Sequence, residues 1–385
     1  MDIRNDFLLR IGLEARKNRI SFWNDQDTVS VRVAQTPQGN SAGLWFRTQG
    51  CTYDAQGGCI MCDYSNGPKT SISQMISYVA NGLKDVPEDC VTLLVSPSGS
   101  MFDCGEVPRE ALIGILHLLQ QSAFEHILFE TRAETITEDT IALCRQILGE
   151  RFYGVYMGLE AASPFLLKYC INKQLSLHKA QQAIDICRAQ DVAIIANVLV
   201  GIPFLNAEES VTAAVETVQW ALARGASGCD LFPVHIKKAT PLEVLYKEGI
   251  YSPPSLWELT EVITRLEPDI WLRIGLSWYT SNGAYNIICS PATCPSCQDA
   301  VIECLKGFAD THKAEFVHTM NSIICQCRQK WKNHEDDTML PDRIIRGYAA
   351  LAGQFLSRQW WENNLASVCS QIWSDWENTG GWHVI

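Results

Sequence analysis

The stretch LHKAQQAIDICRAQDVAIIANVLVGIPFLNAEESVTAAVETVQWALA, residues 177–223, decides the fold class of this chain. Apolar residues recur with helical spacing over residues 177–189 and again over 207–223. Between them, residues 192–200 form a short apolar run rich in β-branched side chains, which is typical of a buried strand. This order of helix, strand and helix predicts parallel β/α units joined by right-handed crossovers.

The same alternation runs through the first 240 residues. Six apolar runs are predicted strands, at residues 44–48, 91–95, 126–130, 152–157, 192–200 and 230–234. Five stretches of helical periodicity separate them, at residues 71–84, 109–122, 138–149, 177–189 and 207–223. Six units do not close an eight-stranded barrel. We therefore predict an α/β fold with a partial (β/α)6 TIM-type barrel, whose chemistry lies at the C-terminal ends of the strands.

The pattern changes after about residue 240, where cysteines concentrate and the chain becomes mainly helical. We predict an N-terminal extension (1–40), the partial barrel (41–240), a cysteine-rich auxiliary region (241–335) and C-terminal helices (336–385). The last segment is rich in tryptophan, and we interpret those side chains as packing residues.

Composition and charge restrict the class of protein. A chain of 385 residues that is 47% hydrophobic and 19% charged can bury a core and is not extensively disordered. The longest apolar run is shorter than a membrane helix needs, and the N-terminus lacks the apolar core of a signal peptide. We expect a cytoplasmic protein with no membrane partner. A formal net charge of −12 favours a small-molecule substrate over a nucleic acid.

Three cysteines directly follow the first predicted strand. Cys51, Cys59 and Cys62 are spaced C-x7-C-x2-C on a glycine-bearing loop. Three thiolates on such a loop can hold an iron–sulfur cluster and leave one iron open to bind a small molecule. Zinc is the alternative, but it would need a fourth protein ligand, and no further His or Cys follows until Cys90.

A second set of cysteines lies downstream. Cys294 and Cys297 form a C-x2-C pair, and Cys325 and Cys327 form a C-x-C pair. Four soft ligands in two short pairs suit either a tetrahedral zinc ion or a cluster. Cys289 is a spare candidate.

Motifs along the chain resemble the radical S-adenosylmethionine (SAM) superfamily. The long first gap of the cysteine loop is similar to the branch that contains the archaeosine synthase radical SAM subunit and Elp3-like proteins. The resemblance covers most of residues 44–330 through RTQGC, GCIMCDY, SPSGSMFDCGEVP, FETRAETIT, GLEAAS, CINKQLS, VGIPFLNAEE and SPPSLWEL. The chain is also similar to radical SAM enzymes of nucleoside-antibiotic biosynthesis that exchange a ring oxygen for sulfur.

This resemblance implies two cofactor sites. A [4Fe–4S] cluster that binds SAM would sit on Cys51, Cys59 and Cys62, and an auxiliary [4Fe–4S] cluster would sit on the four downstream cysteines. The implied cofactor-binding residues lie at strand ends: Ser98, Gly99, Arg132, Glu160, Asn197 and Gly201. Glu130 and Glu160 are the candidate catalytic carboxylates. The alternative for each is a solvated or salt-bridged strand-end residue.

The resemblance also implies the chemistry. Reductive cleavage of SAM, driven by an external one-electron donor of the flavodoxin or ferredoxin type, would give a 5′-deoxyadenosyl radical that abstracts a substrate hydrogen. We expect sulfur insertion or related C–S chemistry on a nucleoside or nucleotide. The alternatives are a radical lyase acting on a modified tRNA base and a non-enzymatic metal-binding scaffold. His235, Lys237 and Lys238 are candidate phosphate ligands, and Trp278 or Tyr279 could stack on a base.

Overall fold

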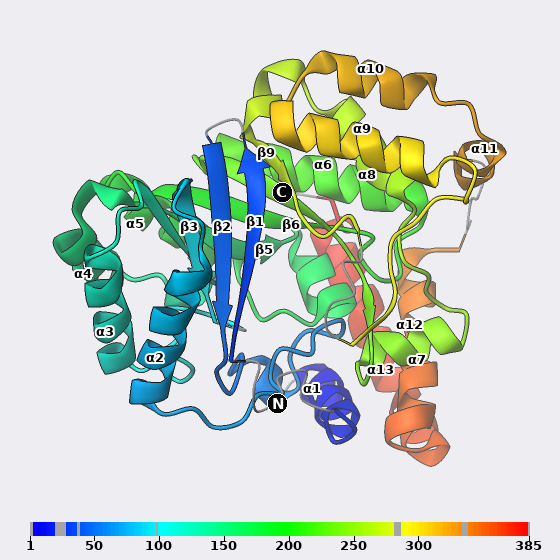
Figure 1. Ribbon diagram of the computed structural model, residues 1–385. Helices are drawn as coiled ribbons and strands as arrows, with labels where there is room; N and C mark the ends of the chain where they lie inside the picture. The colour runs from blue at the N-terminus through cyan, green and yellow to red at the C-terminus, as the bar shows by residue number, and fades with distance from the viewer. Residues whose placement is uncertain are drawn as a thin grey trace.

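A curled eight-stranded sheet forms the centre of the computed structural model, which describes residues 3–19, 28–36, 39–97, 99–280, 286–332 and 338–383 (Figure 1). The strands follow the order β1-β2-β3-β4-β5-β6-β7-β9. Their bounds are Val29–Thr36, Gly39–Phe46, Cys90–Ser96, His126–Arg132, Phe152–Glu160, Ala193–Val200, Gly228–Pro233 and Ile274–Leu276. Neighbours from β2 to β9 pair in parallel, whereas β1 is antiparallel to β2.

The predicted α/β half-barrel is confirmed, and the six predicted strands are β2 to β7. The sheet has two further strands that the prediction missed. β1 comes from the segment assigned to the N-terminal extension and forms a hairpin with β2, from Val29 opposite Phe46 to Thr36 opposite Gly39. β9 adds a seventh parallel strand, but it spans only three residues and leaves little periodic signal.

Five helices follow the strands β2 to β6 and cover the outer face of the sheet (Figure 1). They are α2 (Ile72–Gly82), α3 (Arg109–Gln120), α4 (Glu138–Leu148), α5 (Leu177–Ala189) and α6 (Ala207–Ala223), close to the predicted ranges. Side-chain caps fix their starts: Ser71 and Asn206 form capping boxes, and Thr137 accepts a hydrogen bond from the Thr140 amide. The helices bury apolar faces against fully buried strand residues, which places the main core between the two layers.

The C-terminal part is mainly helical, as predicted. It contains α7 (Pro241–Lys247), α8 (Leu256–Arg265), α9 (Gln298–Thr311), α10 (Ala314–Ser322), α11 (Gln326–Lys332), α12 (Leu340–Phe355) and α13 (Arg358–Thr379). Strand β8 (Ile236–Lys237) precedes α7 in the chain, and strand β10 (Ile287–Cys289) follows α8. The two strands pair as a short antiparallel ribbon. In the described ranges, every helix is too short or too polar to cross a lipid bilayer.

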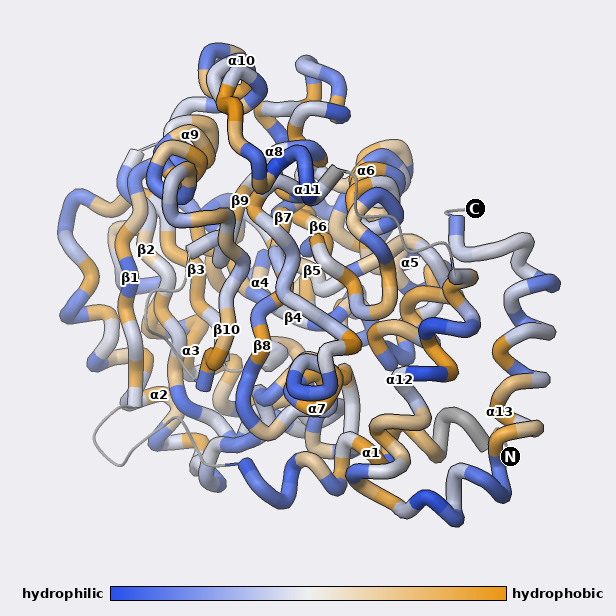
Figure 2. Tube along the Cα trace, turned by 90° about the vertical axis from the view of Figure 1, so that its right-hand side faces the viewer, coloured by the Kyte–Doolittle hydropathy of each residue, from blue (hydrophilic) through white to orange (hydrophobic). Residues whose placement is uncertain are grey.

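Helix α1 (Ile3–Arg16) packs against α7 and α12, so a helix from the N-terminal part of the chain lies beside helices from its C-terminal part (Figure 2). The ring of Phe7 stacks on Trp360 with 5.0 Å between centroids, and Trp376 contacts Phe165 edge-on at 5.1 Å. These two tryptophans therefore serve as packing residues, in line with the prediction.

Candidate active site

The cysteine loop begins just after β2 and folds back on itself. The Cys51 amide donates to the Tyr64 carbonyl at 3.3 Å. Gly50 makes this approach possible: its φ is +94°, and a Cβ there would lie 1.8 Å from the Tyr64 oxygen. The backbone geometry therefore requires glycine immediately before the first cysteine.

A π-helical turn, Leu166–Ile171, lies against the part of the cysteine loop that contains Cys59. The Ile60 amide donates to the Ile171 carbonyl at 3.0 Å, and the Asn172 side chain donates to the Gly58 carbonyl at 2.7 Å. Single π-helical turns are frequent at functional sites. Here the turn positions the two residues that flank Cys59.

A buried ion pair closes the base of the loop. Arg19, which follows α1, contacts the Asp54 carboxylate at 2.5 Å and donates to the Cys62 carbonyl at 2.7 Å. Asp54 also accepts from the Ser65 amide at 2.7 Å. Burial raises the pKa of Asp54, and the adjacent guanidinium opposes that shift. The N-terminal segment thus helps to shape the cysteine loop.

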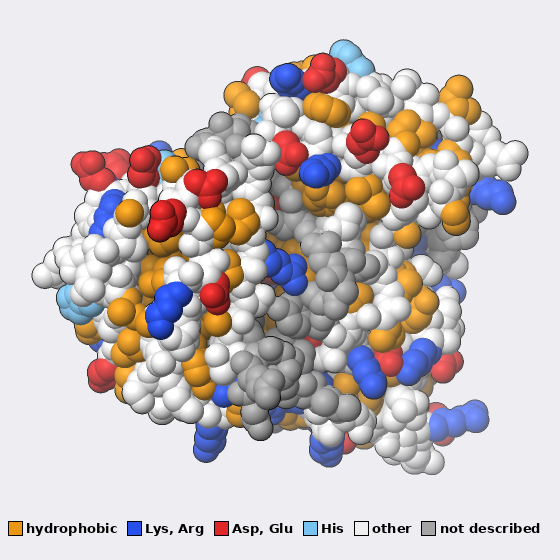
Figure 3. Space-filling model, in the orientation of Figure 1, with side chains coloured by type: hydrophobic (Ala, Val, Ile, Leu, Met, Phe, Trp, Pro, Cys, Tyr) orange, Lys and Arg blue, Asp and Glu red, His pale blue; other side chains and the backbone are white. Residues whose placement is uncertain are grey.

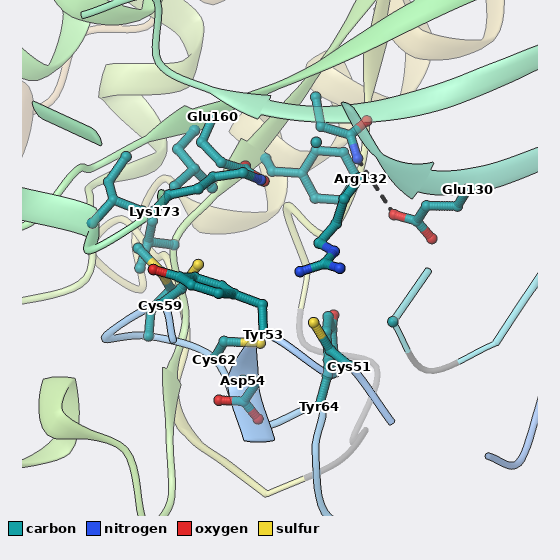
Figure 4. Close-up of a pocket in the computed structure, with 18 of the residues that line it drawn as sticks. Cys51, Tyr53, Asp54, Cys59, Cys62, Tyr64, Glu130, Arg132, Glu160 and Lys173 are labelled. Carbon is teal, nitrogen blue, oxygen red and sulfur yellow. Dashed lines mark hydrogen bonds and ion pairs between the residues drawn. The ribbon is translucent and has the colours of Figure 1, made fainter. Parts of the chain in front are cut away.

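The three thiols line one cavity of about 200 Å³ at the C-terminal ends of the strands, and this cavity is partly open to solvent. Five of the predicted cofactor or catalytic residues line the same cavity: Gly99, Glu130, Arg132, Glu160 and Asn197. Figure 4 shows the Arg132 guanidinium pointing toward Cys51, and Glu160 and Lys173 on the side of Cys59. Residues far apart in the chain are therefore gathered around the cysteine loop, as the barrel rule predicts.

Glu130, at the end of β4, is buried within a small polar network. Its carboxylate accepts from the Ser96 hydroxyl at 3.0 Å and from the Asn197 amide at 3.3 Å. Burial raises the pKa of Glu130, although both hydrogen bonds oppose the shift. The Asn197 Oδ1 atom is buried without a hydrogen-bond partner among the described residues, so this wall of the cavity has an acceptor free for a ligand.

Arg132 lies beside the first cysteine. Its guanidinium contacts Asp103 at 2.7 Å and Thr52 at 3.3 Å, and Thr52 in turn donates to Asp103. Within the described chain, Arg132 Nε is buried with no partner. A buried donor left unpaired is costly, which makes Arg132 suited to an anionic ligand such as a carboxylate.

Lys173 is a cavity residue to which sequence analysis gave no role. Its ammonium lies 2.8 Å from the Glu160 carboxylate and is only 7% exposed. Burial favours the neutral amine, yet Glu160 and Cys59 together raise the pKa of Lys173. Glu160 itself adopts a left-handed backbone with φ of 70°, a strained state of the kind found at functional sites. The sequence did contain a signal for Lys173, because this residue belongs to CINKQLS, one of the motifs that carry the resemblance.

Glu106 connects the cysteine loop to the loop after β3. Its carboxylate accepts from the Thr48 hydroxyl at 2.6 Å and from the Ser100 amide at 2.7 Å. Burial raises the pKa of Glu106 to about 7. The folded protein therefore binds this proton more tightly than the unfolded chain does. The stability that Glu106 contributes is present at low pH and is lost as the pH rises from about 4.5 to about 7.

We predict that Glu106→Gln makes the free energy of unfolding less dependent on pH between about pH 4.5 and about pH 7. Between pH 5 and pH 8, wild-type protein should lose roughly 2.5 kcal/mol of unfolding free energy relative to the variant. Urea unfolding at pH 5, 6, 7 and 8 measures the difference. Glu110→Gln, at an exposed position on α3, is the control and should follow wild type. Parallel curves for wild type and Glu106→Gln would contradict the prediction.

Two predicted cofactor-binding residues are not among those that line the cavity in the described part of the chain. Gly201 does not line it: a Cβ at this position would lie 2.5 Å from Pro254, and its φ of +85° also requires glycine. Ser98 lies outside the described residues. Its neighbour Gly99 contacts Cys51, since a Cβ on Gly99 would lie 2.7 Å from that residue's Cα.

Two of the three predicted phosphate ligands, Lys237 and His235, are engaged by other residues. Lys237 lines the cavity, but its ammonium lies 2.8 Å from the buried Asp63 carboxylate and 3.9 Å from the centre of the Tyr64 ring. His235 hydrogen-bonds the Trp278 carbonyl at 2.5 Å, and burial lowers the pKa of His235. Neither side chain is a free cation for a phosphate. Trp278 lines the cavity, so its predicted stacking role stays open.

The four downstream cysteines also come together. Cys294 and Cys297 precede α9, Cys325 precedes α11, and Cys327 lies in its first turn. They form a closed ring of sulfur contacts: 294 to 297 at 3.6 Å, 297 to 327 at 3.5 Å, 327 to 325 at 3.3 Å and 325 to 294 at 3.3 Å. None of these thiols lines the cavity. Cys289, the spare candidate, lies in β10 and is not part of the ring.

The two cysteine sets differ in spacing. Across the described ranges, only the downstream set brings three or more potential ligand atoms within 4.8 Å of one another. The thiols of the first loop face one cavity without converging on one point. This wider arrangement fits a cubane cluster, in which each thiolate binds a different iron. Burial raises the pKa of Cys59 to about 12, so its thiolate form would need a metal beside it.

Comparison with known proteins supports the predicted resemblance. No protein-family model matches the chain. Archaeosine synthase subunit beta of Methanosarcina acetivorans is 26% identical over 74% of this chain and 82% of its own length. The subunit beta of Thermococcus kodakarensis is 23% identical over 85% of this chain and 99% of its own. The chain thus resembles these proteins over most of their length, at low identity.

Solved structures resemble the chain more loosely. Elp3 of Methanocaldococcus infernus is 12% identical, with a TM-score of 0.45, over 62% of this chain and 59% of its own. A radical S-adenosylmethionine methyltransferase of Kitasatospora setae is 13% identical, with a TM-score of 0.44, over 75% and 60%. The chain spans about three fifths of the length of these two structures.

Proposed function

We propose that this chain is a radical SAM enzyme whose active site is the cavity beneath the cysteine loop. The observation that carries the proposal is the joint position of Cys51, Cys59 and Cys62 with the strand-end residues around one cavity. The motif resemblance and the archaeosine synthase relatives support it. A bound [4Fe–4S] cluster, reduced by a one-electron donor of the flavodoxin or ferredoxin type, would supply the electron that cleaves SAM to methionine and a 5′-deoxyadenosyl radical.

The residues of this chain would bind and orient SAM. Arg132 has an unpaired buried N–H beside Cys51 and would bind the carboxylate of the amino acid part. Asn197 and Glu130 would accept hydrogen bonds from ribose hydroxyls, because both residues line the cavity and the Asn197 Oδ1 atom has no partner among the described residues. The Lys173–Glu160 pair would fix the wall next to Cys59. Buried apolar residues behind this wall would keep water from the radical.

We further propose a nucleoside or nucleotide as the substrate. The net charge of −12 argues against a large polyanion, and on the face in Figure 3 the described Lys and Arg side chains are scattered rather than gathered into a stripe. Trp278 gives the cavity a ring on which a base can stack. The competing candidate is a radical lyase on a modified tRNA base, which the archaeosine synthase relatives favour.

An anaerobic assay separates these substrates. With reconstituted protein, SAM and reductant, we expect a nucleoside or nucleotide to raise the rate of 5′-deoxyadenosine formation, and we expect tRNA not to do so. In parallel, tRNA should show no gel shift at 50 mM salt, where phosphate contacts are strong. A shift that weakens steeply with salt, together with stimulation by tRNA, would favour the lyase. Absence of 5′-deoxyadenosine under every condition would favour the non-enzymatic scaffold.

A more specific candidate reaction is sulfur insertion or related C–S chemistry. The observation in its favour is the second cysteine set in a protein with a formal net charge of −12. This reaction requires that Cys294, Cys297, Cys325 and Cys327 hold an auxiliary [4Fe–4S] cluster able to give up a sulfide, rather than a metal without sulfide. The candidate therefore depends on what the four clustered thiols bind, and a sulfur-containing product should appear with loss of that cluster.

A further inference from the structure

We propose that the downstream cysteines hold one tetrahedrally coordinated zinc ion rather than an auxiliary iron–sulfur cluster. The inference rests on the positions of the four sulfurs and does not require that the cavity cleaves SAM. It bears on that reaction, however, because a zinc–thiolate site contains no sulfide to donate.

The sulfur spacing is that of ligands sharing one metal. A tetrahedral zinc ion with Zn–S bonds of about 2.3 Å holds its ligand sulfurs about 3.8 Å apart. The four ring contacts of 3.3 to 3.6 Å are close to this value, and all four sulfurs lie within 4.8 Å of one another. In a cubane each thiolate binds a different iron, so the ligand sulfurs must surround four irons and their sulfides. A ring this tight has no room for such a cluster.

The surroundings stabilise a thiolate site. The Trp257 indole N–H donates to the Cys327 sulfur at 3.1 Å, and the Ser296 hydroxyl lies 3.0 Å from the Cys294 sulfur. The Arg328 guanidinium stacks over the Trp257 ring at 4.9 Å, which adds a positive charge beside the site. Four thiolates and one Zn²⁺ carry a net charge of −2, and donors and cations of this kind offset it.

The position of the ring indicates what the ion does. It joins three segments that have little regular structure of their own: the turn before α9, the residues after α10 and the start of the short helix α11. Cys327 also contacts α8 through Trp257. The sulfurs belong to a complete four-ligand set and lie outside the cavity lining, so the ion has no position open for substrate. The zinc would therefore fasten the α9–α11 region to the barrel.

Metal analysis tests the inference on the full-length protein. After anaerobic reconstitution with iron and sulfide, followed by desalting, we expect one zinc and four irons per chain. X-ray absorption at the zinc edge should show four sulfur neighbours near 2.3 Å and no iron neighbour. This measurement uses wild-type protein and does not depend on a variant that folds.

Variants assign each metal to its thiols. Cys327→Ser should lose the zinc and keep four irons with the electron paramagnetic resonance signal of a [4Fe–4S] cluster. Cys59→Ala should keep the zinc and lose the four irons of the first cluster. Cys304→Ser is the matched control, because Cys304 is a free cysteine on α9 that is not part of the ring, and it should keep both metals. Eight irons without zinc, or five irons without zinc, in wild-type protein would overturn the inference. If the protein contains one zinc per chain but does not cleave SAM, the proposed function is wrong and the zinc inference is unaffected.

Discussion

Cys59→Ala is expected to reduce 5′-deoxyadenosine formation to the uncatalysed background. Three thiolates are the minimum set that holds a cubane cluster while leaving one iron for SAM, so the loss of one thiolate leaves the cluster without a defined binding site. Cys59 also faces the cavity beside the Lys173–Glu160 pair. The measurement is chromatographic quantification of 5′-deoxyadenosine after anaerobic incubation with SAM and reductant, with iron content determined on the same sample.

Cys369→Ala is the matched control. Cys369 is partly buried, like Cys59, but it lies on α13 and lines no part of the cavity. This variant should retain wild-type iron content and 5′-deoxyadenosine formation. If Cys59→Ala retained SAM cleavage at the wild-type rate, the assignment of the cluster to this loop would be wrong.

Lys237→Met is expected to lower the free energy of unfolding by about 3–5 kcal/mol, the largest stability effect we predict. Lys237 and Asp63 are 2.8 Å apart, and the Asp63 side chain is only 1% exposed. Removal of the ammonium leaves a buried carboxylate with no opposing charge at this distance. Asp63 adjoins Cys62, so the same change should also loosen the cysteine loop. Urea unfolding of the protein before cluster reconstitution measures the effect.

Two further variants define the cause. The double variant Asp63→Asn/Lys237→Met should recover much of the lost stability, because it removes both charges together. Lys313→Met breaks the ion pair with Glu315, in which both side chains are more than 60% exposed, and should change stability by less than about 1 kcal/mol. Equal small effects of Lys237→Met and Lys313→Met would show that the buried pair contributes no more than a surface pair.

Periodicity predicted the fold well where elements are long. The helices α5 and α6 have the predicted bounds, because each combines a clear apolar face with a side-chain cap. The strand β1 was missed although VSVRVAQT alternates in character, because no neighbouring helix placed it in a β/α unit. The strand β9 was missed because three residues cannot establish a period.

The sequence predicted which residues line the candidate site better than it predicted which of them pair with one another. The position of Cys51, Glu130 and Asn197 follows from the rule that strand ends meet at one site. The pairing of Lys237 with Asp63 joins residues 174 positions apart, and local sequence contains no signal for it. The choice between zinc and a cluster likewise depends on sulfur positions in three dimensions, since both use the same cysteine spacings.

The hairpin of β1 with β2 has a consequence for how firmly the cysteine loop is held. Without β1, the strand that leads into the loop would lie at the edge of the sheet, with one row of its backbone groups exposed to water. Hydrogen bonds to β1 on one side and to β3 on the other make β2 an interior strand. Amide protons of β2 should accordingly exchange slowly with solvent, and thermal fraying that begins at the sheet margin would reach β1 before it reached the thiols.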